Sequence, residues 1–175
     1  MPLAVKICGL RTLEAVEAAV AGGAGFVGFV FFEKSPRHVS PPEVKALACA
    51  VPQNVIKVGL IVDASDAEIE NTLREAPLDM LQLHGTETPE RVAEIKKKFS
   101  VPVMKAVAVS TAHDIAAARA FEAVADRLLF DARPPRDADR PGGHGRAFDW
   151  ALLAGQSFAV PWMLAGGLTP ENVAE

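Results

Sequence analysis

The stretch Val5-Lys6-Ile7-Cys8-Gly9 contains the end of the first of seven short apolar runs in this chain of 175 residues, and the glycine that follows it. Side chains alternate in direction along a strand, so Lys6 and Cys8 lie on one face of it. The seven runs are rich in Val, Ile, Leu and Phe and span residues 3–8, 25–32, 55–62, 78–83, 102–109, 126–131 and 160–165. Runs that are apolar on both faces are typical of a parallel sheet covered by helices.

The segments between these runs carry apolar residues at helical spacing and clear helix starts. Ser40 and Ser65 each begin a capping box, and Thr88 and Thr169 each precede a proline at the first helical position. We therefore predict repeated βα units, with a last, short helix that begins near Pro170. Repeated units of this kind form either a closed (β/α)₈ barrel or an open doubly wound sheet.

The residues at the ends of the runs decide between these two folds. In an open sheet, ligands gather at one switch point, whereas in a barrel every strand end contributes to one mouth. Polar residues or glycines lie at the C-terminal end of almost every run or follow it, namely Cys8, Arg37, Asp63, Gln82, His84, Asp131, Gly166 and Gly167. This distribution favours the α/β class with a (β/α)₈ TIM barrel, as a single domain over residues 1–175.

Seven runs are one short of a complete barrel. We expect only about seven βα units, so that the domain is incomplete at its C-terminal end. A sheet that does not close exposes the edges of its first and last strands, which invites pairing with other chains.

Composition and charge argue against a nucleic-acid partner and against a membrane partner. The chain has 18 Lys and Arg against 22 Asp and Glu, so no basic excess indicates a nucleic-acid partner. No charged segment leads into an apolar secretory stretch, and the longest apolar run is too short to span a membrane. Two cysteines far apart in the sequence do not form a disulfide framework. We expect a cytoplasmic protein without a membrane partner.

Cys8 ends its strand, precedes a glycine and shares a face with Lys6. An ammonium group beside a thiol favours the reactive thiolate form. A free cysteine is more often a small buried apolar residue, which is what we expect of Cys49 in a predicted helix. Cys8 is therefore the cysteine with a candidate chemical role.

Asp131 follows the apolar run at residues 128–130. A carboxyl group at the end of such a strand is partly desolvated, and desolvation favours the neutral form that a general acid needs. The alternative is a structural carboxylate that caps a helix or pairs with Arg133 or Lys105. If both strand ends open onto one mouth, Cys8 and Asp131 offer a base and an acid to a common substrate.

Three further features suit an anionic substrate. The guanidinium of Arg37 suits a carboxylate; the alternative interpretation is an arginine on the surface without a role in binding. Gly166 and Gly167 lead from a strand towards a helix start, where backbone N–H groups suit a phosphate; a plain tight turn is the alternative. His84 fits a structural or positioning role beside the substrate. No cluster has the spacing of metal ligands, so we expect no metal.

The loop at residues 132–149 is long and rich in charge, proline and glycine, and it contains Pro141-Gly142-Gly143-His144-Gly145. Long loops with glycine hinges often act as lids over active sites. Disorder without a function is the alternative.

Six motifs in order resemble the phosphoribosylanthranilate isomerases, enzymes of the tryptophan pathway, and the resemblance runs from residue 5 to the end of the chain. They are Lys6-Ile7-Cys8-Gly9, Ser35-Pro36-Arg37, Gln82-Leu83-His84-Gly85, Leu129-Phe130-Asp131, Gly142-Gly143-x-Gly145-x-x-Phe148-Asp149-Trp150 and Leu164-Ala165-Gly166-Gly167-Leu168-Thr169-Pro170-Glu171-Asn172-Val173. Each motif alone is modest, but six in this order are specific. The family usually has threonine where this chain has His144, and we expect small effects from that difference.

The resemblance implies a cofactor-free aldose–ketose isomerase, whose reaction is an Amadori rearrangement of N-(5-phosphoribosyl)anthranilate. It implies that Asp131 protonates the ribose ring oxygen and that Cys8 removes the C2 proton. It also implies that Arg37 holds the anthranilate carboxylate and that Gly166 and Gly167 bind the phosphate. The expected partner is a small phosphorylated substrate, and the expected state is a monomer or homodimer.

Two other interpretations stay open. One is another phosphosugar-converting TIM barrel, such as a related isomerase of histidine biosynthesis; such enzymes usually use two aspartates at the ends of strands 1 and 5, and Cys8 argues against it. The other is an inactive barrel fragment that only binds ligands or self-associates through its edges. We expect the chain of 175 residues to be poorly active by itself.

Overall fold

The computed structural model describes residues 3–135 and 137–173. Seven strands form one sheet in chain order, and all neighbouring strands are parallel. The strands are β1 (Lys6–Cys8), β2 (Phe26–Val30), β3 (Ile56–Ile61), β4 (Met80–Leu83), β5 (Val103–Val109), β6 (Arg127–Ala132) and β7 (Trp162–Leu164). Each coincides with a predicted run to within a few residues, which confirms the strand pattern read from the sequence.

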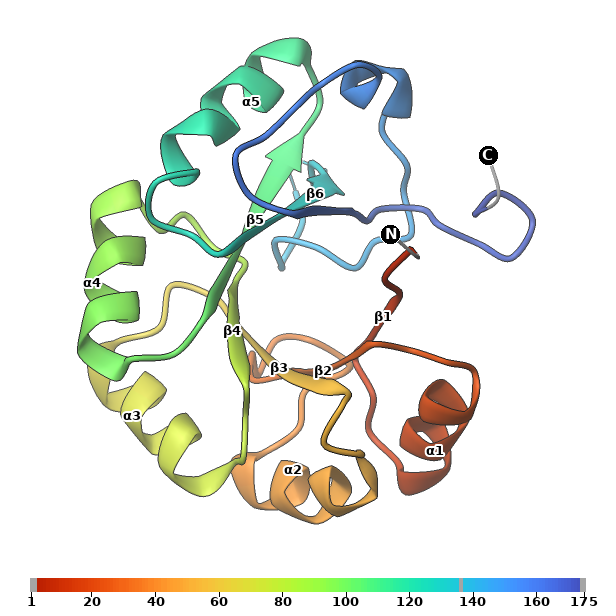
Figure 1. Ribbon diagram of the computed structural model, residues 1–175, viewed down its shortest axis with the longest axis vertical. Coiled ribbons are helices and arrows are strands. Elements are labelled where there is room, and N and C mark those ends of the chain that lie inside the picture. The colour runs from red at the N-terminus through yellow and green to blue at the C-terminus, as the bar shows by residue number, and fades with distance from the viewer. Residues whose placement is uncertain (1–2, 136, 174–175) are drawn as a thin grey trace.

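The helices lie on the outer side of the sheet, which curls around its own interior (Figure 1). The α-helices are α1 (Leu13–Ala21), α2 (Pro41–Leu47), α3 (Asp66–Glu75), α4 (Pro89–Phe99) and α5 (Ala112–Ala117). The 3₁₀ helices are η1 (Ala48–Ala50), η2 (Ala118–Phe121) and η3 (Trp150–Leu153). Ser40, Ser65 and Thr88 are N-caps, which confirms three of the four predicted helix starts.

Alternation along the strands divides the buried side chains between two layers. One set faces the interior of the curled sheet: Phe26, Val58, Met80, Met104, Ala106, Leu129 and Met163. The other set faces the helices and includes Leu81, Leu83, Val103, Leu128 and Phe130. The apolar interior gives the sheet a rigid floor, so that polar side chains at the strand ends rest on packed atoms.

The connection between β6 and β7 and the end of the chain differ from the other units. β6 leads through a long loop to η3, a single 3₁₀ segment rather than an α-helix. At the predicted helix start near Pro170 the described residues form a turn up to Val173, in which Val173 N donates to Thr169 O at 3.0 Å as in the first turn of a helix; the rest of the predicted helix lies outside the described residues. There the side chain of Asn172 accepts from Thr169 N (2.7 Å), as the third residue of a capping box does, and donates to Gly167 O (2.9 Å).

The two edges of the sheet are β1 and β7 over the described residues. Val5 and Ile7 on or next to β1, and Trp162 on β7, are exposed apolar side chains. By contrast, every residue of the inner strand β2 is buried. Over the same part of the chain, none of the helices combines the length and apolar character needed to cross a membrane.

Candidate active site

One pocket of about 800 Å³ opens where the strands end and continues between the edge strands to Leu3, Arg127 and Trp162. All six residues that the sequence nominates line it: Cys8, Arg37, His84, Asp131, Gly166 and Gly167. Parallel strands deliver their C-terminal ends to one edge of a sheet, and the curl of this sheet turns that edge into a mouth. The tertiary structure thus brings together residues up to 159 positions apart, from Cys8 to Gly167.

Cys8 and Lys6 reach into the pocket over the same point of β2. Cys8 is the register partner of Gly28. A Cβ atom on Gly28 would lie 2.8 Å from Cys8 Sγ and 3.1 Å from Lys6 Nζ. The absence of a side chain at Gly28 therefore leaves room for the thiol and the ammonium together, which confirms their shared face.

Arg37 lies against two glycines that have left-handed backbone conformations. Its side chain packs over Gly9 (φ +83°) and under Gly143 (φ +76°). The φ values suit glycine, and a Cβ at either position would strike the guanidinium group or its stem. Arg37 is half-buried in this sandwich rather than free on the surface, and its guanidinium lies at the pocket.

Asp131 faces His84 rather than either of the structural partners considered from the sequence. Its Oδ2 lies 3.3 Å from His84 Nε2, and the two side chains are only 13% and 11% exposed. Its Oδ1 accepts a hydrogen bond from Ala132 N at 2.8 Å. Arg133 pairs with Asp114, and Lys105 pairs with Glu87. The carboxyl of Asp131 is thus left to the pocket.

The long loop after β6 lies directly over this pair. A Cβ on Gly142 would lie 2.6 Å from His84 Nε2 and 3.0 Å from Asp131 Oδ2. His84, Asp131 and Arg37 therefore all touch the glycine-rich part of the loop. His144 Nε2 lies 3.0 Å from Arg140 O and braces the loop from within. The placement agrees with a lid, whose opening and closing stay a prediction.

Gly166 and Gly167 both have positive φ values, +83° and +71°. No acceptor for their N–H groups is found among the described residues. Successive free N–H groups in such a conformation form a concave site for anions. A Cβ on Gly166 would lie 2.8 Å from Asp131 Oδ1, so this turn adjoins the candidate acid.

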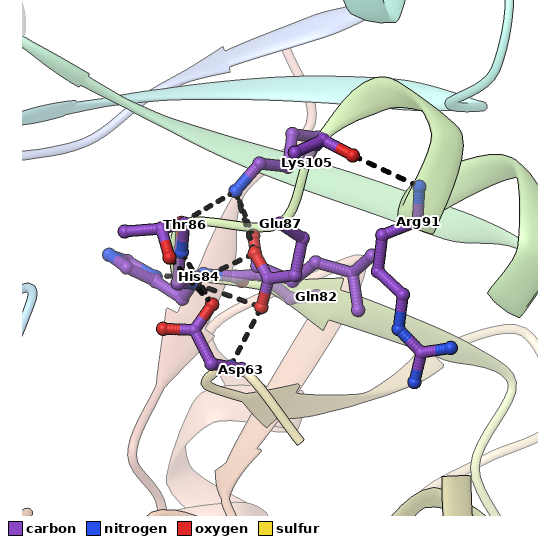
Figure 2. A network of polar contacts seen from close by, with 10 residues as sticks. Asp63, Gln82, His84, Thr86, Glu87, Arg91 and Lys105 are labelled. Atoms are coloured by element: carbon purple, nitrogen blue, oxygen red, sulfur yellow. Dashed lines mark hydrogen bonds and ion pairs between the residues drawn. The ribbon is translucent and has the colours of Figure 1, made fainter. Parts of the chain in front are cut away.

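A buried polar network beneath the loop after β4 holds His84 in place, and sequence reasoning missed most of it. Lys105 Nζ donates to Glu87 Oε2 and Gly85 O, both at 2.8 Å, and Asp63 N donates to Glu87 Oε1 at 2.9 Å. Figure 2 shows Lys105 and Asp63 reaching Glu87 from opposite sides. One feature of the sequence could have indicated this network: Lys105 is a lysine inside the apolar run that forms β5, and a buried lysine needs a polar partner.

Two polar side chains lie elsewhere than the sequence suggested. Asp63 does not line the pocket but accepts from Thr86 N at 2.6 Å, as part of this network. Cys49 is exposed on η1, and the expectation that it is buried is wrong. Its helix ends in a 3₁₀ turn that directs the thiol outward, where Sγ donates to Lys45 O.

A second network joins the ends of β5 and β6. Burial alone would raise the pKa of Asp114, but hydrogen bonds from the backbone and hydroxyl groups of Ser110 and Thr111 lower that pKa to about 2. Arg133, two residues after Asp131, binds the same carboxylate and also Ser110 Oγ. The start of the loop after β6 is thereby tied to β5.

Among the described residues, no three His, Cys, Asp or Glu side chains gather closely enough to hold a metal ion. The pocket instead offers a thiol beside an ammonium, a carboxyl beside an imidazole, the guanidinium of Arg37, and the N–H groups of Gly166 and Gly167. This set suits proton transfer on a substrate that carries more than one negative group.

Comparison with known proteins gives concordant results. Residues 5–175 match the family described as N-(5'phosphoribosyl)anthranilate (PRA) isomerase. The chain is 56% identical over 175 residues to N-(5'-phosphoribosyl)anthranilate isomerase of Paracoccus denitrificans, covering 100% of this chain and 81% of that protein. The TIM-barrel class is confirmed by phosphoribosyl anthranilate isomerase from Thermotoga maritima, with a TM-score of 0.85 and 35% identity over 98% of this chain and 80% of that one.

Another solved structure is a phosphoribosyl anthranilate isomerase in complex with reduced 1-(o-carboxyphenylamino)-1-deoxyribulose 5-phosphate. It is similar to this chain with a TM-score of 0.83 and 32% identity, over 99% of this chain and 80% of that chain. That compound carries a carboxylate and a phosphate.

Proposed function

The chain belongs to the N-(5'-phosphoribosyl)anthranilate isomerase family, and on that premise we propose that it catalyses the Amadori rearrangement of N-(5-phosphoribosyl)anthranilate. The product is 1-(2-carboxyphenylamino)-1-deoxyribulose 5-phosphate, and the reaction is a step of tryptophan biosynthesis. It is an aldose–ketose isomerisation within one molecule, so protons move but no net oxidation takes place. Side chains that donate and accept protons are sufficient for such chemistry.

In this proposal Asp131 donates a proton to the ring oxygen of the ribose, and the ring opens to a Schiff base. Cys8, as the thiolate, then removes the proton from C2. Support comes from the placement of the two groups, which line one pocket from β6 and β1. The burial of Asp131 excludes most water, and the side chains of Lys6 and Cys8 reach into the pocket over the same point of β2.

The two anionic ends of the substrate fit the two anion-binding features. We assign the anthranilate carboxylate to Arg37, whose planar guanidinium can hold both carboxylate oxygens. We assign the phosphate to the N–H groups of Gly166 and Gly167. His84 lies beside Asp131 in the same pocket, and we assign it to substrate binding. A pocket of about 800 Å³ is large enough for a substrate of this size.

The observation that carries the proposal is the convergence of all six nominated residues on one pocket. Its test follows the loss of anthranilate-type fluorescence with freshly made substrate. We expect Cys8→Ala and Asp131→Asn each to lower kcat by about 100-fold or more, because each removes a proton-transfer group.

Cys49→Ala is the matched control, because Cys49 is the other cysteine and lies outside the pocket. It should leave turnover unchanged. Unchanged turnover in both Cys8→Ala and Asp131→Asn would contradict the mechanism. Turnover of a different phosphosugar in a substrate panel would instead favour another activity of the same fold.

The exposed edges favour a second property, self-association. Ile7 and Trp162 present apolar surface at β1 and β7, and edge strands pair readily with other chains. Size-exclusion chromatography of the chain of 175 residues, with the assay run on each peak, tests whether it is a poorly active, self-associating species. A monodisperse, fully active monomer would contradict this second property and would support the isomerase alone.

For the isomerase itself we propose a single domain, a monomeric or homodimeric active state and a cytoplasmic location.

A further inference from the structure

Gln82 is a polar side chain at a place in the fold where an apolar one would pack at lower cost. It is 1% exposed and, from its register with Leu60 and Met104, faces the interior of the curled sheet. Burying an amide is unfavourable unless hydrogen bonds compensate for its lost water. Its Oε1 has no hydrogen-bond partner among the described residues, so the side chain contributes little to a general polar network.

Within the described part of the chain, this side chain has one hydrogen bond, and it is to the residue beside the candidate acid. Gln82 Nε2 lies 2.7 Å from His84 Nδ1. An amide nitrogen only donates, so this orientation of the Gln82 amide assigns the acceptor role, without a proton, to Nδ1 of His84. A neutral His84 therefore holds its proton on Nε2, the nitrogen that lies 3.3 Å from Asp131 Oδ2. Figure 2 shows Gln82 and His84 side by side.

The position of this proton matters when Asp131 gives up its own. The acid becomes a carboxylate at that moment, and N–H groups already directed at it stabilise the new charge without rearrangement. The N–H of Ala132 donates to Oδ1 of Asp131, and the Nε2–H of His84 lies beside Oδ2 of the same carboxyl group. The other tautomer would turn a lone pair of Nε2 towards the new charge and repel it.

We propose that Gln82 is a positioning residue that holds His84 in the Nε2–H tautomer, so that His84 stabilises the carboxylate of Asp131 after proton donation. This inference rests on the proposed role of Asp131 as the general acid. The proton that Asp131 gives goes to the ring oxygen of the substrate; His84 keeps its own proton and passes none on. Gln82 also lines the pocket, but its hydrogen bond is to His84 and it has none to Asp131 among the described residues, so we assign its effect to the orientation of His84.

The tautomer is measured directly by long-range ¹H–¹⁵N correlation spectroscopy of the ¹⁵N-labelled chain. The four histidines are separated by comparison with a His84→Asn variant, in which the signals of His84 are missing. We expect Nδ1 of His84 to be unprotonated and Nε2 to be protonated in the wild-type chain. A protonated Nδ1, alone or together with Nε2, would overturn the proposal, and this result needs no variant of Gln82.

Gln82→Met removes the donor and keeps the length of the side chain in an apolar surrounding. We expect His84 to become a mixture of tautomers, and kcat to fall by about tenfold or more with KM within about twofold of wild type. Gln82→Leu serves the same purpose if the methionine variant does not fold. Met104→Leu is the control, because Met104 is the register partner of Gln82, is fully buried and makes no polar contact with His84. It should keep both the tautomer and kcat.

A Gln82→Met variant that keeps the tautomer or keeps kcat overturns the proposal, and so does a change in tautomer without a change in kcat. Failure of the proposed function is recognised separately. If the wild-type chain does not convert N-(5-phosphoribosyl)anthranilate, the proposed function fails, while the spectra still decide whether Gln82 sets the tautomer of His84.

Discussion

The two sides of the pocket hold their chemical groups in different ways. On the side of β4 and β6, Asp131 and His84 rest on buried polar partners: Gln82 below, and the Lys105–Glu87 pair under the loop. On the side of β1 and β2, Cys8 lies on an edge strand, and its side chain occupies the room that Gly28 leaves because glycine has no side chain. One side is positioned by hydrogen bonds, the other by register and space.

The chemistry of each side explains the difference. A carboxylic acid that must donate in one direction has two oxygens to orient, and each needs a partner. A thiolate is a single atom with little directional preference, so a rigid strand and free room are sufficient. We therefore expect the acid side to be sensitive to the loss of polar partners, and the base side to be sensitive to added volume.

The largest effect is expected on the acid side, for Lys105→Met. Lys105 and Glu87 are 4% and 3% exposed, and removal of one partner leaves an uncompensated buried charge. The free energy of unfolding should fall by about 3–5 kcal/mol, measured by urea denaturation. In Lys105→Met/Glu87→Gln the buried charge is gone and the amide oxygen still accepts from Asp63 N. This double variant should recover part of the loss; no recovery would argue against an uncompensated charge as the cause.

On the base side, Gly28→Ala should displace both Cys8 and Lys6, because the new Cβ would lie 2.8 Å and 3.1 Å from their terminal atoms. We expect kcat/KM to fall by about 100-fold, since small misplacements of a reacting group are costly. Gly25→Ala is the control, because its Cβ would meet only Val5 O, at 4.0 Å. Equal activity of the two variants would mean that space over Gly28 does not position the thiol.

A smaller effect is expected from Asp114, which ties the end of β5 to Arg133. The pKa of this carboxyl is about 2 in the folded chain against an ordinary value of 3.8. The stabilisation is therefore complete above that ordinary value and is lost as the pH falls towards about 2. Asp114→Asn should lower the free energy of unfolding at neutral pH by about 1–2 kcal/mol. Denaturation curves should show this difference shrinking in acid; a constant difference would contradict the linkage.

The smallest effect is expected from the loss of a helix N-cap, and it serves as a control for the effect of stability on turnover. Ser65 caps α3, and its hydroxyl accepts from Glu68 N. Ser65→Ala should cost about 1 kcal/mol of unfolding free energy without changing kcat, because the cap lies outside the pocket. Thermal unfolding and the fluorescence assay measure the two quantities. A fall in kcat here would mean that stability alone alters turnover, and the losses on the acid side would need to be reinterpreted.

Most of the architecture was predictable because it follows from local patterns. The apolar runs correspond to the seven strands, and Ser40, Ser65 and Thr88 mark helix starts through bonds to residues three positions away. At Thr169 the bonds from Thr169 N to Asn172 Oδ1 and from Val173 N to Thr169 O are those of a helix start, and the rest of the helix predicted near Pro170 lies outside the described residues. Cys49 is exposed because a 3₁₀ turn rotates it outward, and apolar neighbours in the sequence do not reveal this.

The sequence by itself determined the repeated βα pattern and the six residues that meet at the pocket, because strand ends of a curled parallel sheet share one mouth. Only the tertiary structure decided which groups pair there. Asp131 faces His84 rather than Arg133 or Lys105, Asp63 supports the loop after β4, and Gly28 makes room for Cys8. These contacts join residues from different βα units, and their distances depend on how the sheet curls, which no local pattern encodes.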